Sequence, residues 1–127
     1  MKFTHYRQST ARLNYAGKTI LIDPMLAEKG TYPPFEGAVT GNMEMNPLVD
    51  LPVSSDELTS GLDAVIVTHL HYEHWDEVAA KMLDKNLPIF VQNEVDAAVI
   101  RESGFTKVYV MGDNTHFDNI TISRVYG

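Results

Sequence analysis

The chain contains the stretch Thr68-His69-Leu70-His71-Tyr72-Glu73-His74-Trp75-Asp76, which holds three of its five histidines and two carboxylates. The stretch follows Ala64-Val65-Ile66-Val67, an apolar run with the length and β-branched content of a buried strand. It leads into residues 75–83, whose apolar side chains recur at helical spacing. The pattern therefore predicts that the histidines lie at a junction between a strand and a helix.

The position and chemistry of these residues favour a metal site. Ligands in open α/β sheets collect beyond the carboxyl ends of strands. His69 and His71 can point the same way if strand geometry continues, and His74 can return to the same centre through a tight turn. Imidazoles and carboxylates suit zinc, manganese or iron, and the chain has no cysteine. The alternative is a polar loop, with Glu73 and Asp76 as solvated or helix-starting acids.

The histidine motif also carries a family resemblance. The run His69-Leu70-His71-Tyr72-Glu73-His74 resembles the H-x-H-x-D-H signature of the metallo-β-lactamase superfamily, with glutamate in place of the usual aspartate. The resemblance implies up to two divalent metal ions, with zinc as the expected metal and manganese or iron as alternatives. It implies that His69 and His71 help to bind the first ion, and that Glu73 and His74 help to bind the second.

A second segment extends the resemblance to three acidic residues. Ile20-Leu21-Ile22-Asp23-Pro24 predicts a strand that ends at proline, and it resembles a segment of the UlaG-like branch in which the aspartate lies near the metal loop. On local grounds alone, Asp23 is a turn residue before proline. With the resemblance, Asp23 and Asp76 are predicted to fix histidine tautomers by hydrogen bonds, and Glu73 to hold the second metal or orient the nucleophile.

The remaining pattern predicts an α/β fold. Expected strands cover residues 1–6, 10–15, 18–22, 89–91, 108–110 and 120–122, and expected helices follow the caps Ser54 and Asn93. Residues 25–62 form a long irregular segment, either a lid over the site or a surface insertion. His116 is predicted to lie in a loop. The resemblance implies the αβ/βα sandwich, with residues 1–127 as a single, partial domain that forms its N-terminal half.

Composition sets limits on partners and location. Hydrophobic residues make up 44% of the chain and charged residues 21%, which is typical of a globular protein. The net charge of -7 argues against a nucleic-acid partner, because such proteins usually carry a basic face. We find no signal-like segment or apolar run of membrane-spanning length, so no membrane partner is expected. With no cysteine, a cytoplasmic location is the simplest prediction.

The leading functional hypothesis is a metal-dependent hydrolase that acts on a small molecule through a metal-activated water. The resemblance allows esters, lactones, amides and phosphodiesters. One alternative is a non-catalytic metal-binding half-domain or assembly module, and a weaker one is a di-iron oxidoreductase. Because half a sandwich leaves apolar faces at residues 65–67 and 89–91 to be covered, we expect either a homo-oligomer or pairing with a C-terminal half.

Overall fold

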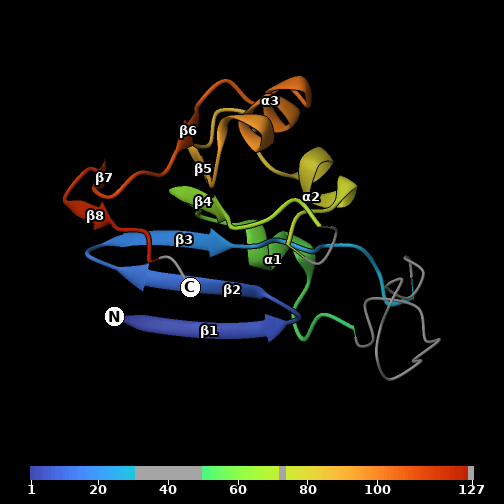
Figure 1. Cartoon of the computed structure of the whole chain (residues 1–127). Coiled ribbons are helices and arrows are strands. Elements are labelled where there is room, and N and C mark those ends of the chain that lie inside the picture. The colour runs from blue at the N-terminus through green and yellow to red at the C-terminus, as the bar shows by residue number, and fades with distance from the viewer. Residues whose placement is uncertain (31–49, 72–73, 126–127) are drawn as a thin grey trace, which may run out of the picture.

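The computed structural model describes residues 1–30, 50–71 and 74–125, which form an α/β fold (Figure 1). In chain order the elements are β1 (Lys2–Arg7), β2 (Thr10–Tyr15), β3 (Lys18–Ile22), α1 (Ser55–Thr59), β4 (Ala64–Val67), α2 (Glu77–Met82), β5 (Ile89–Val91), α3 (Glu94–Glu102), β6 (Val108–Val110), β7 (Thr115–Phe117) and β8 (Ile120–Ile122). The predicted fold class is confirmed.

Six strands form one sheet in the order of the chain, from β1 to β6. The first three strands pair antiparallel, and β3 to β6 then pair in parallel. Ala16 and Gly17 both have positive φ in the turn between β2 and β3, as a tight two-residue hairpin requires. Because β3 to β6 run the same way, the residues that follow them meet at one edge of the sheet, here called the carboxyl edge.

The two faces of the sheet are covered differently. On one face, buried side chains of β3 to β6 pack against α1, α2 and α3. On the other face, Phe90 packs with Met111 and with the β7–β8 hairpin. Figure 1 shows α2 and α3 on one side of the view and the hairpin on the other. Val65, Val67, Ile89 and Val91 are fully buried under the helices, whereas Ile66 on the opposite face is half-buried, so the need of that face for a further cover stays a prediction.

Two local predictions also need correction. His116 lies in β7 instead of a loop, because it pairs with Thr121 of β8 across the turn at Asp118. The helix expected from Trp75 begins two residues later, at Glu77, because the Asp76 side chain accepts from the Ala79 amide and so caps the helix there.

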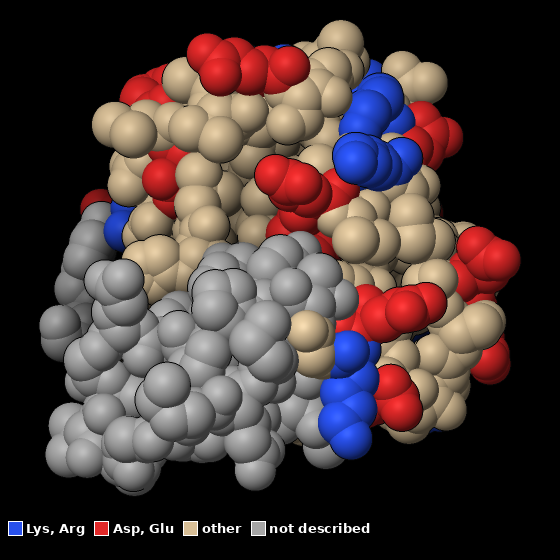
Figure 2. Space-filling model, turned by 90° about the vertical axis from the view of Figure 1, so that its right-hand side faces the viewer, with Lys and Arg blue, Asp and Glu red and all other residues tan. Residues whose placement is uncertain are grey.

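The surface carries charges of both signs. Figure 2 shows acidic and basic side chains interspersed over the side of the molecule that it draws. In residues 1–30, 50–71 and 74–125, none of the helices is long and apolar enough to cross a membrane.

Candidate metal centre

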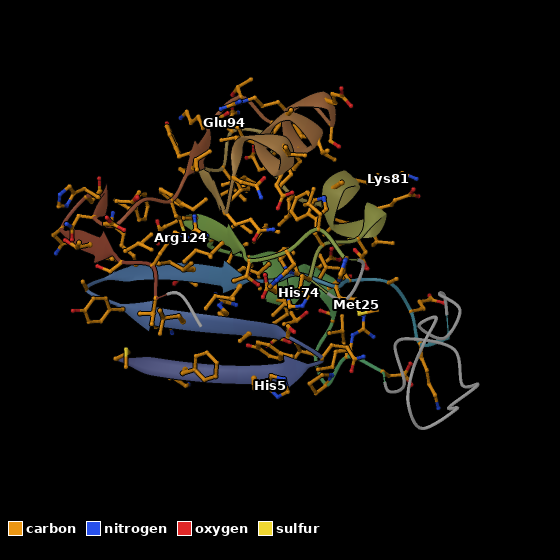
Figure 3. The ribbon with its side chains drawn as sticks, in the orientation of Figure 1. His5, Met25, His74, Lys81, Glu94 and Arg124 are labelled. Atoms are coloured by element: carbon orange, nitrogen blue, oxygen red, sulfur yellow. The ribbon has the colours of Figure 1, made fainter. Side chains whose placement is uncertain are left out.

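The predicted site residues come together at the carboxyl edge of the sheet. Asp23 follows β3, and its backbone amide donates to the carbonyl of Ile66 in β4 at 2.9 Å. Thr68 and His69 follow β4 directly. The backbone amide of His74 donates to the carbonyl of His71 at 2.8 Å. Parallel pairing of β3 and β4 thus joins residues that lie about fifty positions apart in the chain, and Figure 3 shows His74 in this region.

Asp23 is the centre of a buried hydrogen-bond network. Its Oδ1 accepts from the backbone amide of Thr68 at 2.7 Å, and its Oδ2 accepts from the Thr68 hydroxyl at 2.7 Å. The same Oδ2 lies 2.9 Å from Nδ1 of His74. Asp23 is 4% exposed and has a φ of 48°, so the backbone takes a conformation that is uncommon for a non-glycine residue. The turn therefore aims the carboxylate at the histidine loop.

The network determines which nitrogens can face a metal. An ionised carboxylate only accepts hydrogen bonds, so the contact with Asp23 places a proton on Nδ1 of His74. The Thr68 hydroxyl uses its single proton on Asp23, and it therefore accepts from Nδ1 of His69 at 3.3 Å. Both histidines then keep the lone pair on Nε2. That tautomer is the one that metal-binding histidines have when their other nitrogen contacts a carboxylate or hydroxyl.

The spacing of the three imidazole rings is compatible with pairwise coordination. Ring centres are 4.9 Å apart for His69 and His74, and 6.2 Å apart for His69 and His71. With metal–nitrogen bonds of about 2.1 Å, two imidazoles on one ion have ring centres roughly 4.5 to 6.5 Å apart. Across the described ranges 1–30, 50–71 and 74–125, however, no three His, Asp or Glu side chains form a group able to hold an ion.

Glu73, the fourth predicted metal ligand, lies outside the described residues, as do residues 31–49 of the segment predicted to be a lid or a surface insertion. The roles assigned to His69, His71, Glu73 and His74 stay predictions.

Asp76 has a different environment from Asp23. Its Oδ1 accepts from the Ala79 amide and its Oδ2 accepts from the Ala27 amide, both at 2.8 Å. It is 2% exposed, and it connects the start of α2 to the segment that follows Asp23. These contacts make Asp76 a helix cap and a loop anchor, while its predicted contact with a histidine stays a prediction.

Three supporting residues were not predicted from the sequence. Thr68 was part of the quoted motif, yet no role was assigned to its hydroxyl. The hydroxyl of Thr10 donates to the Asp23 carbonyl at 2.7 Å and accepts from the Met25 amide at 2.9 Å. The buried guanidinium of Arg7 donates to the carbonyls of Met25 and Ala27. Neither Arg7 nor Thr10 belongs to a recognisable motif, so only the folded chain indicates that they hold the turn.

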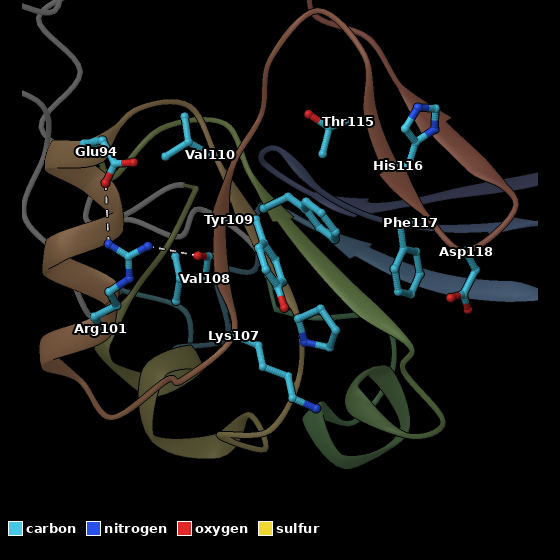
Figure 4. Close-up of a pocket in the computed structure, with 12 residues that line it drawn as sticks. Glu94, Arg101, Lys107, Val108, Tyr109, Val110, Thr115, His116, Phe117 and Asp118 are labelled. Carbon is cyan, nitrogen blue, oxygen red and sulfur yellow. Dashed lines mark hydrogen bonds and ion pairs between the residues drawn. The ribbon is translucent and has the colours of Figure 1, made fainter.

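Two cavities lie beside the parallel strands β4 to β6. The larger, of about 770 Å³, lies between β6 and β7 and is lined by Tyr109 and Phe117 (Figure 4). It does not include any of the histidines of the motif. The smaller, of about 350 Å³, is lined by Thr68 and His69 at the carboxyl edge. The smaller cavity therefore has the better position for chemistry at the histidines.

Comparison with known proteins gives consistent results. The chain matches the Beta-lactamase superfamily domain over residues 2–125. It is 48% identical to UPF0173 protein YddR of Bacillus subtilis (strain 168), over all of this chain and 50% of that protein. The crystal structure of a possible metal-dependent hydrolase from Veillonella parvula DSM 2008 superposes with a TM-score of 0.88 at 46% identity, over 94% of this chain and 45% of that one.

A second solved structure, that of isothiocyanate hydrolase from Delia radicum gut bacteria, superposes with a TM-score of 0.85 at 46% identity. The superposition covers 94% of this chain and 45% of that protein. The chain thus spans about half the length of the relatives that it matches.

Proposed function

Since the chain belongs to the beta-lactamase superfamily, we propose that it forms half of a metal-dependent hydrolase whose active centre is the histidine cluster at the carboxyl edge. The observation that carries the proposal is the hydrogen-bond network of Asp23, Thr68 and His74. The similarity to a possible metal-dependent hydrolase and to an isothiocyanate hydrolase supports it. The substrate class stays open among esters, lactones, amides and phosphodiesters.

The proposed metal ligands are His69, His71, Glu73 and His74. Neutral imidazoles and a carboxylate are suitable donors for zinc, with manganese or iron as alternatives. When bound, such an ion lowers the pKa of a coordinated water and polarises the bond to be cleaved.

The contributions of the protein itself follow from the network. Asp23 holds a proton on Nδ1 of His74, and the Thr68 hydroxyl holds one on Nδ1 of His69. Each histidine then presents Nε2, and its ring cannot rotate without breaking a hydrogen bond. Fixing tautomer and orientation in this way increases the basicity of a ligand and reduces the ordering cost of binding.

The proposal assigns the missing donors to the other half of the protein. The described residues do not complete a group of three donors, and the relatives are about twice as long as this chain. We therefore expect the protein to act with a C-terminal half, or as an oligomer that supplies equivalent residues, and the 1–127 chain alone to hydrolyse poorly.

The experiment replaces one proposed ligand in the full-length protein. His71→Ala should bind less zinc and manganese per molecule by elemental analysis, and it should lose turnover on a panel of ester, lactone, amide and phosphodiester substrates. His116→Ala is the matched control, because His116 is an exposed histidine of β7 away from the cluster. Equal metal content in the His71 variant, the control and the wild type would refute the proposal.

A second candidate is a metal-binding module without turnover. The incomplete donor group in the described residues favours it for the 1–127 chain. The two candidates differ in one result: a hydrolase gains activity when the C-terminal half is present, whereas a binding module gains metal affinity alone.

A further inference from the structure

The turn that follows β3 is held by a buried threonine of β2. Ala11 pairs with Ile22, so Thr10 lies beside Asp23, at the point where the β2–β3 ladder ends. The Thr10 hydroxyl donates to the Asp23 carbonyl at 2.7 Å and accepts from the Met25 amide at 2.9 Å. Thr10 is 0% exposed, so bulk water does not compete for either bond. One hydroxyl thus holds the first and the third residue of the turn.

The conformation of Asp23 explains why this turn needs holding. Its φ of 48° lies in the left-handed region, which is unfavourable for a residue with a β-carbon and persists where the surrounding structure imposes it. Its amide donates to Ile66 of β4, and the next residue, Pro24, has no amide proton. Without the Thr10 hydroxyl, a buried carbonyl and a buried amide at the same turn would lose this partner.

Arg7 holds the same segment from its carbonyl side. Its guanidinium donates to the carbonyl of Met25 at 2.9 Å and to that of Ala27. Met25 is therefore bound at its amide by Thr10 and at its carbonyl by Arg7, and these two residues flank the β1–β2 turn. Figure 3 shows Met25 and His74 at the same end of β3. The β1–β2 turn is thus part of the support of the histidine cluster.

From these contacts we propose that Thr10 is a positioning residue for the metal centre, and that it acts on His74 through Asp23. By fixing the left-handed turn, its hydroxyl sets the direction of the Asp23 carboxylate, which lies 2.9 Å from Nδ1 of His74. Loss of the hydroxyl should let the turn relax toward a commoner backbone conformation and weaken the contact with the ring. The ring is then no longer held with its proton on Nδ1.

The inference rests on the proposed function for the bound metal. The position of the His74 proton, however, can be measured without a metal, so the two proposals can fail separately.

A purely structural role for Thr10 is the competing explanation, because the Asp23 carboxylate is also held by the amide and the hydroxyl of Thr68. If those bonds suffice, loss of the Thr10 hydroxyl lowers stability alone. The left-handed φ of Asp23 favours the positioning role, because the direction in which the carboxylate leaves the backbone changes when φ relaxes. The two roles therefore differ in the folded protein: a structural role leaves the His74 proton and the metal affinity unchanged, whereas a positioning role alters both.

The first measurement uses the metal-free full-length protein with isotope-labelled histidine. At about pH 9, where free histidine is neutral, NMR distinguishes a ring protonated on Nδ1 from one protonated on Nε2. The signal of His74 is identified by its absence from a His74→Gln variant. We expect protonation on Nδ1 in the wild type, a mixture of both forms in Thr10→Val, and protonation on Nδ1 again in Thr10→Ser.

The second measurement is zinc affinity by chelator competition on the same variants. We expect Thr10→Val to bind zinc about 3- to 10-fold more weakly than the wild type, and Thr10→Ser to recover most of the affinity. Thr115→Val is the matched control, because the Thr115 hydroxyl also accepts from a backbone amide, that of Gly112 at 2.8 Å, but lies in β7. The control should match the wild type in both measurements.

The proposal is overturned by a wild-type His74 ring protonated on Nε2, or by a Thr10→Val variant that keeps the wild-type proton position or zinc affinity. A Thr10→Ser variant that recovers neither would assign the effect to packing of the methyl group and also overturn it. If Thr10→Val does not fold, Thr10→Cys takes its place, because a thiol is a weak donor and a weak acceptor and so weakens both bonds. A wild type that binds no metal would refute the hydrolase proposal and leave the ring measurement to decide this one.

Discussion

Asp23 and Asp76 are both buried carboxylates of the candidate site, yet they have different partners. Asp76 accepts from two backbone amides, those of Ala79 and Ala27. Asp23 accepts from the amide and hydroxyl of Thr68 and contacts a histidine ring. The difference shows that burial alone does not identify a functional acid. The contacts described for Asp76 hold the backbone in place, whereas those of Asp23 include a ring nitrogen whose proton affects metal binding.

Asp76→Ala should have the largest effect, and the effect should be on stability. The substitution removes the cap of α2 and leaves the buried Ala27 amide without its acceptor, which together cost about 2 to 4 kcal/mol of unfolding free energy. Urea denaturation measures this loss. Ser54→Ala is the control, because it removes the corresponding cap of α1 from an exposed site and should cost about 1 kcal/mol. A loss no larger than that of the control would show that the Ala27 contact contributes nothing.

Asp23→Asn should have the next largest effect, and the effect should be on metal affinity. Asparagine has nearly the same shape, and its side-chain oxygen can still accept from the Thr68 amide, but the NH2 group in the place of Oδ2 cannot accept a hydrogen bond from His74. Loss of such an orienting contact weakens metal binding by about 10- to 100-fold. Competition with a chelator measures the change.

The control for Asp23 is Asp63→Asn. Asp63 also accepts from a backbone amide, that of Thr19 at 2.8 Å, but it lies before β4, at the opposite end from the histidines. It should bind metal as the wild type does. If both variants lose affinity equally, the carboxylate of Asp23 acts through fold stability and not through His74.

The same two aspartates show how far the sequence could predict the site. The motif indicated where His69 and His74 lie, and the proline after Asp23 indicated where β3 ends. The contact between Asp23 and His74 spans 51 positions, so it depends on the parallel register of β3 and β4, which no local period encodes. The contact of Asp76 with the Ala27 amide spans 49 positions and could not be predicted from the sequence either.

The strands show the same limit on a smaller scale. Strands such as β2 and β4 were predicted because their apolar pattern and flanking turn residues are encoded locally. β7 was missed because it exists through pairing with β8 across a turn in which Asp118 has positive φ. Local chemistry thus predicts elements, whereas long-range pairing decides which of them meet.

Thr68→Val should have a smaller effect that sharpens the comparison. Valine has the same shape but lacks the hydroxyl that bridges Asp23 and His69. The backbone amide of residue 68 still donates to Asp23, so only part of the network is lost. We expect about 5- to 10-fold weaker metal binding, in line with the loss of one hydrogen bond. Thr68→Ser restores the hydroxyl and should recover most of the affinity in the same chelator assay. A serine variant as weak as the valine variant would assign the effect to packing of the methyl group.

Asp118→Asn should have the smallest effect, because this carboxylate is exposed. Asp118 pairs with Lys18 at 2.8 Å and so connects the β7–β8 hairpin to β3. The hydrogen bond and negative charge of Asp118 raise the pKa of Lys18 above its usual value. A raised lysine pKa contributes stability that is fully present at neutral pH and is lost as the pH rises through the raised pKa. Water and salt screen such a surface pair, so the melting temperature at pH 7 should barely change, and the Asp118→Asn variant should match the wild type even more closely at high salt. A melting temperature that falls as far as in Asp76→Ala would mean that the Lys18–Asp118 pair, and not the packing of Phe117 on Phe90, holds the hairpin on the sheet.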